Sequence, residues 1–264
     1  MSNHSAYRTF VDRLSKTKDS EREKSTKKRK SLGLRTAREN LDDLVDPGSF
    51  LEFGAFAVAA QRNRRDYEEL QLETSADGIL TGFCNINEDE VGEDNSHAAA
   101  IIYDYSVLAG SQGFFHHQKL DRICEKAEEF SLPVVIFTEG GGGRPGDTDV
   151  TTQIAGLHIP SFSTWARLTG KCLKIAVNNG YCFAGNAVLF GCSDFMIATK
   201  QSWIGMAGPA MIEGGGLGVY DPKEIGPAEE QYKNGVLDYL AEDEKEATFI
   251  AVSYTHLRAH ETGC

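Results

Sequence analysis

The chain has 264 residues, of which 41% are hydrophobic, and it carries a formal net charge of −12. A negative balance of this size argues against general nucleic-acid binding, and no apolar stretch approaches the ~18 residues that a transmembrane helix needs. The first residues also lack the apolar segment of a secretory signal. We therefore expect a cytoplasmic, globular protein that binds neither nucleic acid nor a membrane.

The first part of the chain is basic, unlike the rest. Residues 1–40 hold 12 Lys and Arg against 5 Asp and Glu, and four of these basic residues are consecutive, from Lys27 to Lys30. Residues 1–34 are polar and show no strong periodicity, so we expect a basic arm or helix that is exposed to solvent. A contact between the basic run and phosphate groups is the alternative.

The next hundred residues combine one capped helix with short strands. Thr36 and Glu39 have the spacing of a capping box, which predicts a short helix after Thr36. The charged segment 61–76 is expected to be an exposed loop, and the acidic segment 87–95 is expected to join two strands as in a hairpin. The strands expected in this part cover 50–53, 78–86 and 98–105.

From about residue 113, helices and strands alternate. The strands are apolar throughout, as in a sheet that is buried on both faces. The helices expected here cover 113–130, 160–169 and 184–190, and the strands cover 133–138, 172–177 and 195–199. This order predicts an α/β fold, built from repeated β-β-α units in a single domain.

Four consecutive glycines, Gly140–Gly143, follow the strand at 133–138. Glycines at the end of a buried strand present backbone N–H groups with no side chain in the way, so they can approach an anion closely. We interpret them as an oxyanion hole made of main-chain amides. Glu139 precedes the run and is either a general base or, as we prefer, a carboxylate that braces the turn by accepting hydrogen bonds from the loop amides.

Other chemical motifs are weak or absent. Gly141–Gly146 matches the dinucleotide fingerprint formally, but Pro145 interrupts it and no acidic residue ends a second strand at the required distance. A phosphate-binding P-loop and a serine-hydrolase elbow are both missing. The six cysteines form no C-x-x-C pair, and we expect no metal site.

The last residues do not fit the pattern of the rest. The stretch Val252–Cys264 resembles the translated sequencing-adapter tail that recurs on truncated reading frames. We therefore treat 252–264 as a non-native tail and expect the natural protein to continue beyond about Ala251. The i, i+4 pair His256 and His260 is discounted as a metal site for the same reason.

Several motifs resemble one known family, the biotin-dependent acyl-CoA carboxyltransferases. They are Arg35–Asn40, Leu44–Glu52, Asp104–Gly113, Thr138–Arg144, Gly180–Ala187 and Gly205–Gly216. The resemblance covers about residues 31–250, and its details are most similar to the carboxyltransferase part of single-chain or long-chain acyl-CoA carboxylases. Glu139, Gly140 and Gly143 depart from the Asp, Ser and Ala that many members have, which leaves the acyl-chain preference open.

The resemblance implies a crotonase-like β-β-α spiral, with residues 35–251 as the N-terminal carboxyltransferase domain that binds acyl-CoA. Such a domain works with a carboxyltransferase C-terminal domain, a biotin carboxyl carrier and a biotin carboxylase. Biotin is then carried by a partner domain, and no metal is needed in this one. The resemblance also implies a homo-oligomer when the protein is whole, and a fragment that is inactive alone.

The site residues implied by the resemblance centre on the glycine run. By position, the amides of Gly141 and Gly142 would hold the thioester oxygen. The other residues expected at the substrate are Gly140, Gly143, Arg144, Ala184 and Gly185, with Lys30, Arg35 and Arg38 at the CoA phosphates. Two alternatives stay open: a biotin-free crotonase-type decarboxylase or hydratase that uses Glu139, and a non-catalytic CoA-binding domain.

Overall fold

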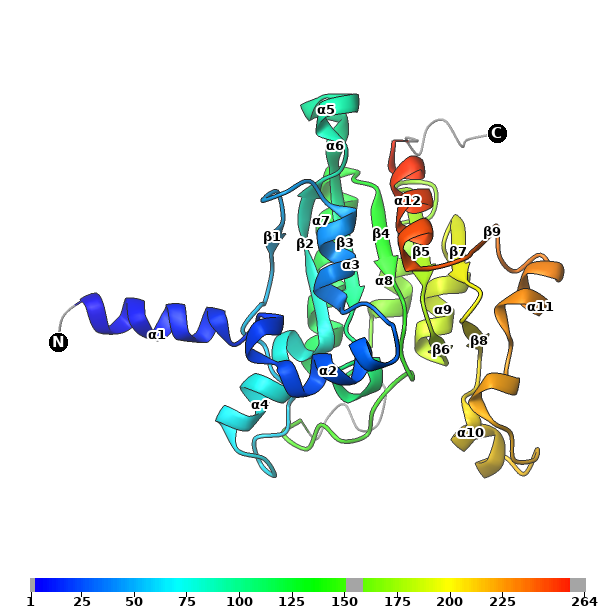
Figure 1. Cartoon of the computed structure of the whole chain (residues 1–264), viewed down its shortest axis with the longest axis horizontal. Coiled ribbons are helices and arrows are strands. Elements are labelled where there is room, and N and C mark those ends of the chain that lie inside the picture. Colours follow the sequence, from blue (N-terminus) through cyan, green and yellow to red (C-terminus); the bar gives the residue numbers. More distant parts are fainter. Residues whose placement is uncertain (1–2, 151–158, 257–264) are drawn as a thin grey trace.

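A large sheet of seven strands runs through the part of the chain that the structure, a computed structural model, describes, namely residues 3–150 and 159–256 (Figure 1). Its strands, in the order in which they lie side by side, are β1 (Leu51–Glu52), β2 (Ile79–Asn85), β3 (His97–Tyr103), β4 (Val134–Phe137), β5 (Lys174–Asn178), β7 (Phe195–Thr199) and β9 (Tyr239–Ala241). A small second sheet pairs β6 (Tyr181–Phe183) with β8 (Trp203–Gly205).

Helices cover both faces of the large sheet, and others lie beyond its ends and edges (Figure 1). They are α1 (Asn3–Ser15), α2 (Glu23–Ser31), α3 (Ala37–Leu44), α4 (Tyr67–Glu73), α5 (Glu88–Val91), α6 (Glu93–Ser96), α7 (Phe114–Phe130), α8 (Ser161–Arg167), α9 (Gly185–Gly191), α10 (Pro209–Gly214), α11 (Ala228–Lys233) and α12 (Glu244–Thr255). None of the helices in the described part is long and apolar enough to cross a membrane.

The sheet is antiparallel at one end and parallel over the rest. β1, β2 and β3 pair antiparallel, and the acidic connection between β2 and β3 folds into the short helices α5 and α6. From β3 to β9 all neighbouring strands are parallel. Parallel neighbours need a crossover connection, and α7 supplies the one between β3 and β4. The α/β architecture predicted from the alternation of helix and strand is confirmed.

Side-chain alternation along the strands divides the interior into two cores. On β4, Val134 and Ile136 pack in the same cluster as Leu120 of α7, whereas Val135 and Phe137 join the cluster of α3 and α12 on the opposite face. Successive strand residues point to opposite faces, so an apolar run becomes buried on both. Figure 1 shows α3 and α12 in front of the sheet.

The short helix predicted after Thr36 forms α3 and has its expected cap. The Thr36 hydroxyl accepts a hydrogen bond from the Glu39 amide at 3.1 Å, and the Glu39 carboxylate accepts one from the Thr36 amide at 2.8 Å. This reciprocal pairing satisfies two amides that a helix start otherwise leaves without acceptors. The helix then buries Leu41 and Leu44 against the sheet.

Two expectations about exposed segments are wrong. Within 61–76, Asp66 caps α4, Leu70 of this helix is buried, and Thr74 and Ser75 after its end are buried too. The basic arm is helical, as one of its two expected forms, but it is not simply solvated: Arg22 and Arg29 are buried in the body of the protein. Charge runs usually mark solvated surface, and here two arginines find carboxylate partners far along the chain.

The segment interpreted as a non-native tail begins inside a helix. α12 continues past Ala251 to Thr255, and the Tyr254 ring packs on Phe195 with 4.3 Å between ring centroids. Tyr254 also lies beside Tyr239 of β9. Residues 257–264, including His260, lie outside the described residues.

Candidate functional site

The glycine run follows β4, and backbone hydrogen bonds hold it on both sides. On one side, the Gly140 amide donates to the Tyr181 carbonyl at 2.7 Å, and the Phe183 amide donates to the Gly140 carbonyl at 2.9 Å. On the other side, the Gln112 amide donates to the Gly142 carbonyl at 2.8 Å. The run therefore joins the small sheet to the segment that leads into α7.

The amides that we expected to form the oxyanion hole are occupied. The Gly141 N–H donates to the Ala109 carbonyl at 3.1 Å, and the Gly142 N–H donates to the Asn186 Oδ1 atom at 3.0 Å. Only the next amide differs: Gly143 is exposed, and among the described residues we find no acceptor for its N–H. The N–H groups of Gly140, Gly141 and Gly142 thus have acceptors within the protein, whereas that of Gly143 has none among the described residues.

A second set of amides lies beside the run, at the start of α9. Ala184 precedes this helix with φ of 52° and ψ of −121° and so turns the chain sharply into its first turn. The first N–H groups of a helix have no acceptor within it, which leaves those of Gly185 and Asn186 available. A side chain on Gly142 would lie 3.5 Å from the Gly185 nitrogen, so the two segments are in contact.

Asn186 links α9 to the glycine run, although it was not among the predicted site residues. Its side chain is buried, accepts from the Gly142 amide, and donates to the Thr138 carbonyl at 3.0 Å. One feature of the sequence could have indicated its role: Asn186 is an amide in an otherwise apolar helix start, and a buried amide side chain needs hydrogen-bond partners. Such partners come from another strand and are not visible in sequence.

Two cavities meet at this place and share Tyr105 and Tyr181 in their walls. The smaller, of about 300 Å³, includes Gly141 and the start of α10. The larger, of about 490 Å³, is bordered by α2, the end of β5 and the start of β8. Its charged and amide-bearing residues are Lys24, Lys28, Arg29, Glu139, Asn179, Gln201 and Lys223.

Glu139 lines the larger cavity but is bound by Arg29. The Arg29 guanidinium contacts both carboxylate oxygens, at 3.1 and 2.8 Å, and both side chains are buried. Burial raises the pKa of Glu139 to about 7, although Arg29 acts in the opposite direction. The Glu139 carboxylate therefore connects the glycine run to α2 through Arg29. It does not bind the loop amides that we expected as its partners, because those of Gly140, Gly141 and Gly142 donate to other acceptors.

The basic residues expected at the substrate are paired with carboxylates. Arg144 contacts Asp77 and Asp147 in a buried network. Lys30, Arg35 and Arg38 pair with Glu39, Asp43 and Glu52, respectively. These cations do not line the two cavities. Of the lysines that line the larger one, Lys28 belongs to the basic run for which a phosphate contact was the alternative, whereas Lys24 and Lys223 were not predicted.

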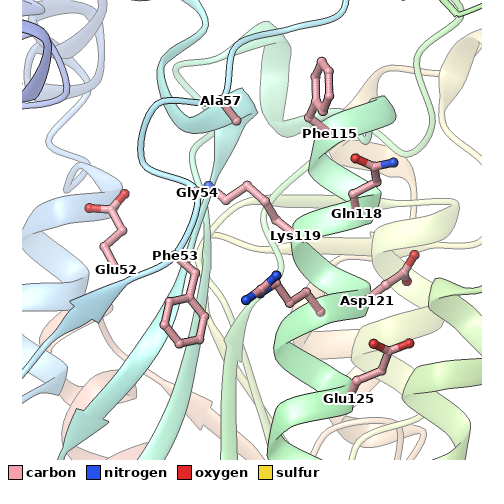
Figure 2. Close-up of a pocket in the computed structure, with 10 residues that line it drawn as sticks. Glu52, Phe53, Gly54, Ala57, Phe115, Gln118, Lys119, Asp121 and Glu125 are labelled. Carbon is pink, nitrogen blue, oxygen red and sulfur yellow. The ribbon is translucent and has the colours of Figure 1, made fainter.

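A third cavity, of about 690 Å³, lies away from the glycine run, between the segment after β1 and α7. In Figure 2, Lys119 extends from α7 toward Gly54, with Glu52 and Phe53 on the facing segment. The Lys119 ammonium donates to the Ala76 and Ile79 carbonyls, and burial lowers its pKa to about 8. This lysine serves the packing of α7, and none of the residues expected at the substrate lines this cavity.

The residues 3–150 and 159–256 contain no cluster of three or more His, Cys, Asp and Glu side chains that could hold a metal ion.

Comparisons with known proteins agree on one family. The carboxyl transferase domain matches residues 28–261. The chain is 30% identical to the methylmalonyl-CoA carboxyltransferase 12S subunit of Propionibacterium freudenreichii subsp. shermanii, over 87% of this chain and 41% of that protein. It is 29% identical to the biotin-dependent long chain acyl-coenzyme A carboxylase beta4 subunit of Mycobacterium tuberculosis, over 94% of this chain and 43% of that protein.

Solved structures give the same result. A single-chain, multi-domain long-chain acyl-CoA carboxylase superposes with a TM-score of 0.90 and 48% identity, over 96% of this chain and 25% of that one. The transcarboxylase 12S structure with methylmalonyl-coenzyme A bound superposes with a TM-score of 0.78 and 27% identity, over 96% and 47%. The expected crotonase-like α/β fold and the resemblance to acyl-CoA carboxyltransferases are confirmed.

The chain spans less than half the length of these relatives. Its large sheet and its glycine run fall within the matched residues, and so do the residues that line the larger cavity, apart from Lys24 and Ser25. The chain belongs to the carboxyl transferase domain family.

Proposed function

We propose that the chain is the acyl-CoA-binding half of a carboxyltransferase that moves a carboxyl group from carboxybiotin to the α carbon of an acyl-CoA. The observation that carries this proposal is the contact between the glycine run and the start of α9, beside a lysine-lined cavity. The similar transcarboxylase 12S structure holds methylmalonyl-coenzyme A, which supports the same ligand class for this chain.

The main task of these residues is to hold negative charge on the thioester oxygen. Removing the α-proton of a thioester puts charge on that oxygen, and preoriented amides stabilise it without reorganising. We assign this role to the Gly143 amide and to the first-turn amides of Gly185 and Asn186, in place of Gly141 and Gly142. Losing one such donor typically costs about 10²–10³ in rate.

The phosphates of the coenzyme would meet Lys24, Lys28 and Lys223. All three line the larger cavity. Lys24 pairs with Glu73 at 3.5 Å, whereas among the described residues Lys28 and Lys223 form no ion pair with a carboxylate. Ammonium groups on flexible side chains suit phosphate oxygens. These lysines replace Lys30, Arg35 and Arg38 in our assignment.

Biotin on a partner domain would supply the carboxyl group and the base that takes the α-proton. We therefore propose as partners a carboxyltransferase C-terminal domain, a biotin carboxyl carrier and a biotin carboxylase, in a cytoplasmic homo-oligomer. The chain's own contribution to that contact is an apolar surface at α10 and the loop after it. Met206, Met211, Leu217 and Val219 are exposed there, next to the smaller cavity.

A biotin-free decarboxylase or hydratase would need Glu139 as its acid or base. Its raised pKa favours proton exchange near neutrality, but Arg29 contacts both oxygens. A carboxylate held in this way is not free to reach a substrate proton. Turnover of an acyl-CoA by this chain without biotin, abolished in Glu139→Gln, would establish the alternative instead.

Calorimetric titration of the chain with a series of acyl-CoA esters tests the proposal. Gly143→Val should weaken acyl-CoA binding at least tenfold without unfolding the protein, because a side chain there meets no atom within 4 Å and would occupy the space beside the amide. Gly191→Val is the matched control: it also has open surroundings but lies at the far end of α9. Equal binding by both variants would contradict the assignment.

The transfer itself is tested by adding a separately produced carboxyltransferase C-terminal domain and a carboxylated biotin carrier. Isotopic carboxylate should then appear in the acyl-CoA. Absence of transfer by this mixture, in the presence of demonstrated acyl-CoA binding, would count against a carboxyltransferase.

A further inference from the structure

α1 presents an apolar stripe that the rest of the chain covers only in part. Tyr7, Phe10, Val11 and Leu14 have the spacing i, i+3, i+4 and i+7, which places them on one face of the helix, and each is between 37% and 67% exposed. The helix has 13 residues, and an isolated helix of this length is marginal in water. The stripe therefore needs a further surface against which to pack.

The second half of α1 is fixed to the body of the protein, and its first half is not. The Phe10 and Phe56 rings lie 5.7 Å apart between centroids, and the Arg13 guanidinium donates to the Phe56 carbonyl at 3.0 Å. Figure 1 shows the first turns of α1 extending away from every other element. The helix therefore leaves the body at Phe56 and carries its stripe outward.

The cavity of about 690 Å³ begins beside this attachment point. Ala57 follows Phe56 and lines the cavity together with Phe53 and the exposed Phe115. Figure 2 shows the segment with Phe53 and Ala57 on one side and α7 with Phe115 on the other. Arg122 of α7 lies 6.0 Å from the centre of the Phe53 ring. The cavity is thus a groove with apolar side chains, the kind of site that receives one face of an amphipathic helix.

The helix and the groove carry opposite charge. Residues 3–16 hold three Lys and Arg against one Asp, whereas residues 121–129 of α7 hold four Asp and Glu against two Lys and Arg. Arg8 of α1 and Glu125 at the groove are both exposed, and among the described residues neither forms an ion pair. The Lys119 ammonium in the groove wall is held by backbone carbonyls. A basic helix and an acidic rim attract each other.

We propose that α1 of one copy of this chain lies in the groove between the segment after β1 and α7 of a second copy, which returns the same contact. The helix and the groove meet at Phe56 and Ala57 on one chain, so a single twofold axis can pair both, as a symmetric dimer requires. Val11 then enters the groove, and Arg8 faces Glu125. This self-complementarity favours a second copy over a different protein. The contact does not depend on the proposed carboxyltransferase activity.

Sedimentation equilibrium of the 264-residue chain across the micromolar range tests the contact. The parent chain should dimerise, and Val11→Glu should weaken the dimer about tenfold or more, because it puts a charge on the stripe. Thr9→Glu is the matched control, since Thr9 is exposed on the opposite face of α1, and it should change the dissociation constant by no more than about twofold. A monomeric parent chain, or equal weakening by both variants, would overturn the proposal.

A mixture of two variants tests whether the groove is the docking place. Phe115→Lys alters the groove and leaves α1 intact, whereas Val11→Glu alters α1 and leaves the groove intact. The equimolar mixture should associate more tightly than either variant alone, because one of its two contacts is preserved. Should Phe115→Lys lower the melting temperature, Glu125→Lys at the exposed rim takes its place. A mixture that gains nothing would overturn the assignment, as when two α1 helices pack on each other.

A separately produced carboxyltransferase C-terminal domain tests another occupant of the groove. This domain should bind the Val11→Glu variant as tightly as it binds the parent chain, because the two contacts use different surfaces. If Val11→Glu weakens binding of the domain and leaves self-association unchanged, α1 serves that domain and the proposed dimer contact fails.

Discussion

The glycines that follow β4 divide into two pairs with different surroundings. A side chain at Gly140 would come within 2.2 Å of the Gly110 carbonyl oxygen, and one at Gly142 would come within 2.7 Å of the Ala184 Cβ atom. Gly142 also has φ of +86°, which other residues rarely adopt. Gly141 and Gly143 have neither restriction. Close packing therefore requires glycine at 140 and 142, whereas Gly141 and Gly143 are exposed and accessible to a ligand.

This division predicts that the same substitution destabilises the protein at Gly142 and has little effect on its stability at Gly143. Gly142→Val should lower the free energy of unfolding by about 2–5 kcal/mol, through backbone strain and overpacking against Ala184. Gly143→Val should change it by less than about 0.5 kcal/mol, as an exposed site with open surroundings. Urea unfolding of both variants measures the difference. A Gly142→Val variant as stable as the parent would contradict the contact with Ala184.

Glu139 should make the stability of the protein depend on pH. Burial raises its pKa from the ordinary 4.5 to about 7, so between these values the folded chain keeps a proton that the unfolded chain has lost. The contribution of this group is complete below about pH 4.5 and is lost as the pH rises through about 7. The Gln variant has no proton to lose.

Glu139→Gln should therefore lose less stability than the parent chain between pH 5 and pH 8. Urea midpoints at several values across this interval measure the two slopes. Parallel curves would show that Glu139 is already ionised at pH 5 in the folded protein. The comparison uses slopes because the substitution also changes the contact with Arg29 at every pH.

Among the helices, α2 has the most consequence for the site. It is polar and short, yet it delivers Arg29 to Glu139 and to the Arg35 carbonyl, the latter at 2.7 Å from Nε. Glu244 at the start of α12 lies 3.8 Å from the same guanidinium. One arginine thus connects α2, the end of β4 and α12.

Removing this arginine should be costly only while its partner remains. Arg29→Met leaves the Glu139 carboxylate buried without a counter-ion, for which we expect a loss of about 3–5 kcal/mol at pH 8. The double variant Arg29→Met with Glu139→Gln should lose distinctly less, because no buried charge is left at that position. Urea unfolding of the two single variants and the double variant gives the coupling energy. Additive losses would mean that the two side chains do not interact.

The elements with strong local signals were predicted well. β7 has its predicted bounds, α7 begins one residue after its predicted start, and α3 begins directly after Thr36 as predicted, because capping residues and apolar periodicity act over a few neighbours. α4 was missed, since its buried face rests on few residues such as Leu70. The surroundings of Arg29 were missed for another reason: its partner Glu139 is 110 residues away, and no local pattern reports such a pairing.

The same limit applied to the site. The sequence located the glycine run, and the structure places Ala184 and Gly185 beside it. The direction of each amide could not be predicted, because it depends on whether Ala109, Tyr181 or Asn186 supplies an acceptor. For the same reason the phosphate contacts were assigned to Lys30, Arg35 and Arg38, which pair with carboxylates, and not to the lysines that line the cavity.

At the scale of the whole molecule, one exposed apolar surface calls for a partner. Met211 is 63% exposed and Leu217 is 72% exposed, on α10 and the loop after it. Exposed apolar groups that gather beside a cavity commonly mark an interface. The proposed occupant is the carboxyltransferase C-terminal domain.

Met211→Glu and Leu217→Glu should therefore weaken association with that domain at least tenfold and leave the melting temperature unchanged. Phe249→Glu is the control, because Phe249 is also exposed, at 71%, but belongs to α12, which lies above α10 and apart from it in Figure 1. Sedimentation of the mixed domains measures association. Equal weakening by all three variants would mean that α10 is not specific to the contact.

The long reach of Arg29 and Arg35 also bears on the order of events during translation. The Arg35 amide donates to the Glu244 carboxylate at 2.7 Å, across 209 residues, and the partner of Arg29 lies 110 residues downstream. The ribosome has to polymerise the segment between Arg35 and Glu244, which are 209 residues apart, before the basic segment can complete these contacts. At a synthesis rate of roughly 5–20 residues per second, this takes on the order of ten seconds or more. For most of that time the basic segment is outside the ribosomal tunnel but cannot yet dock.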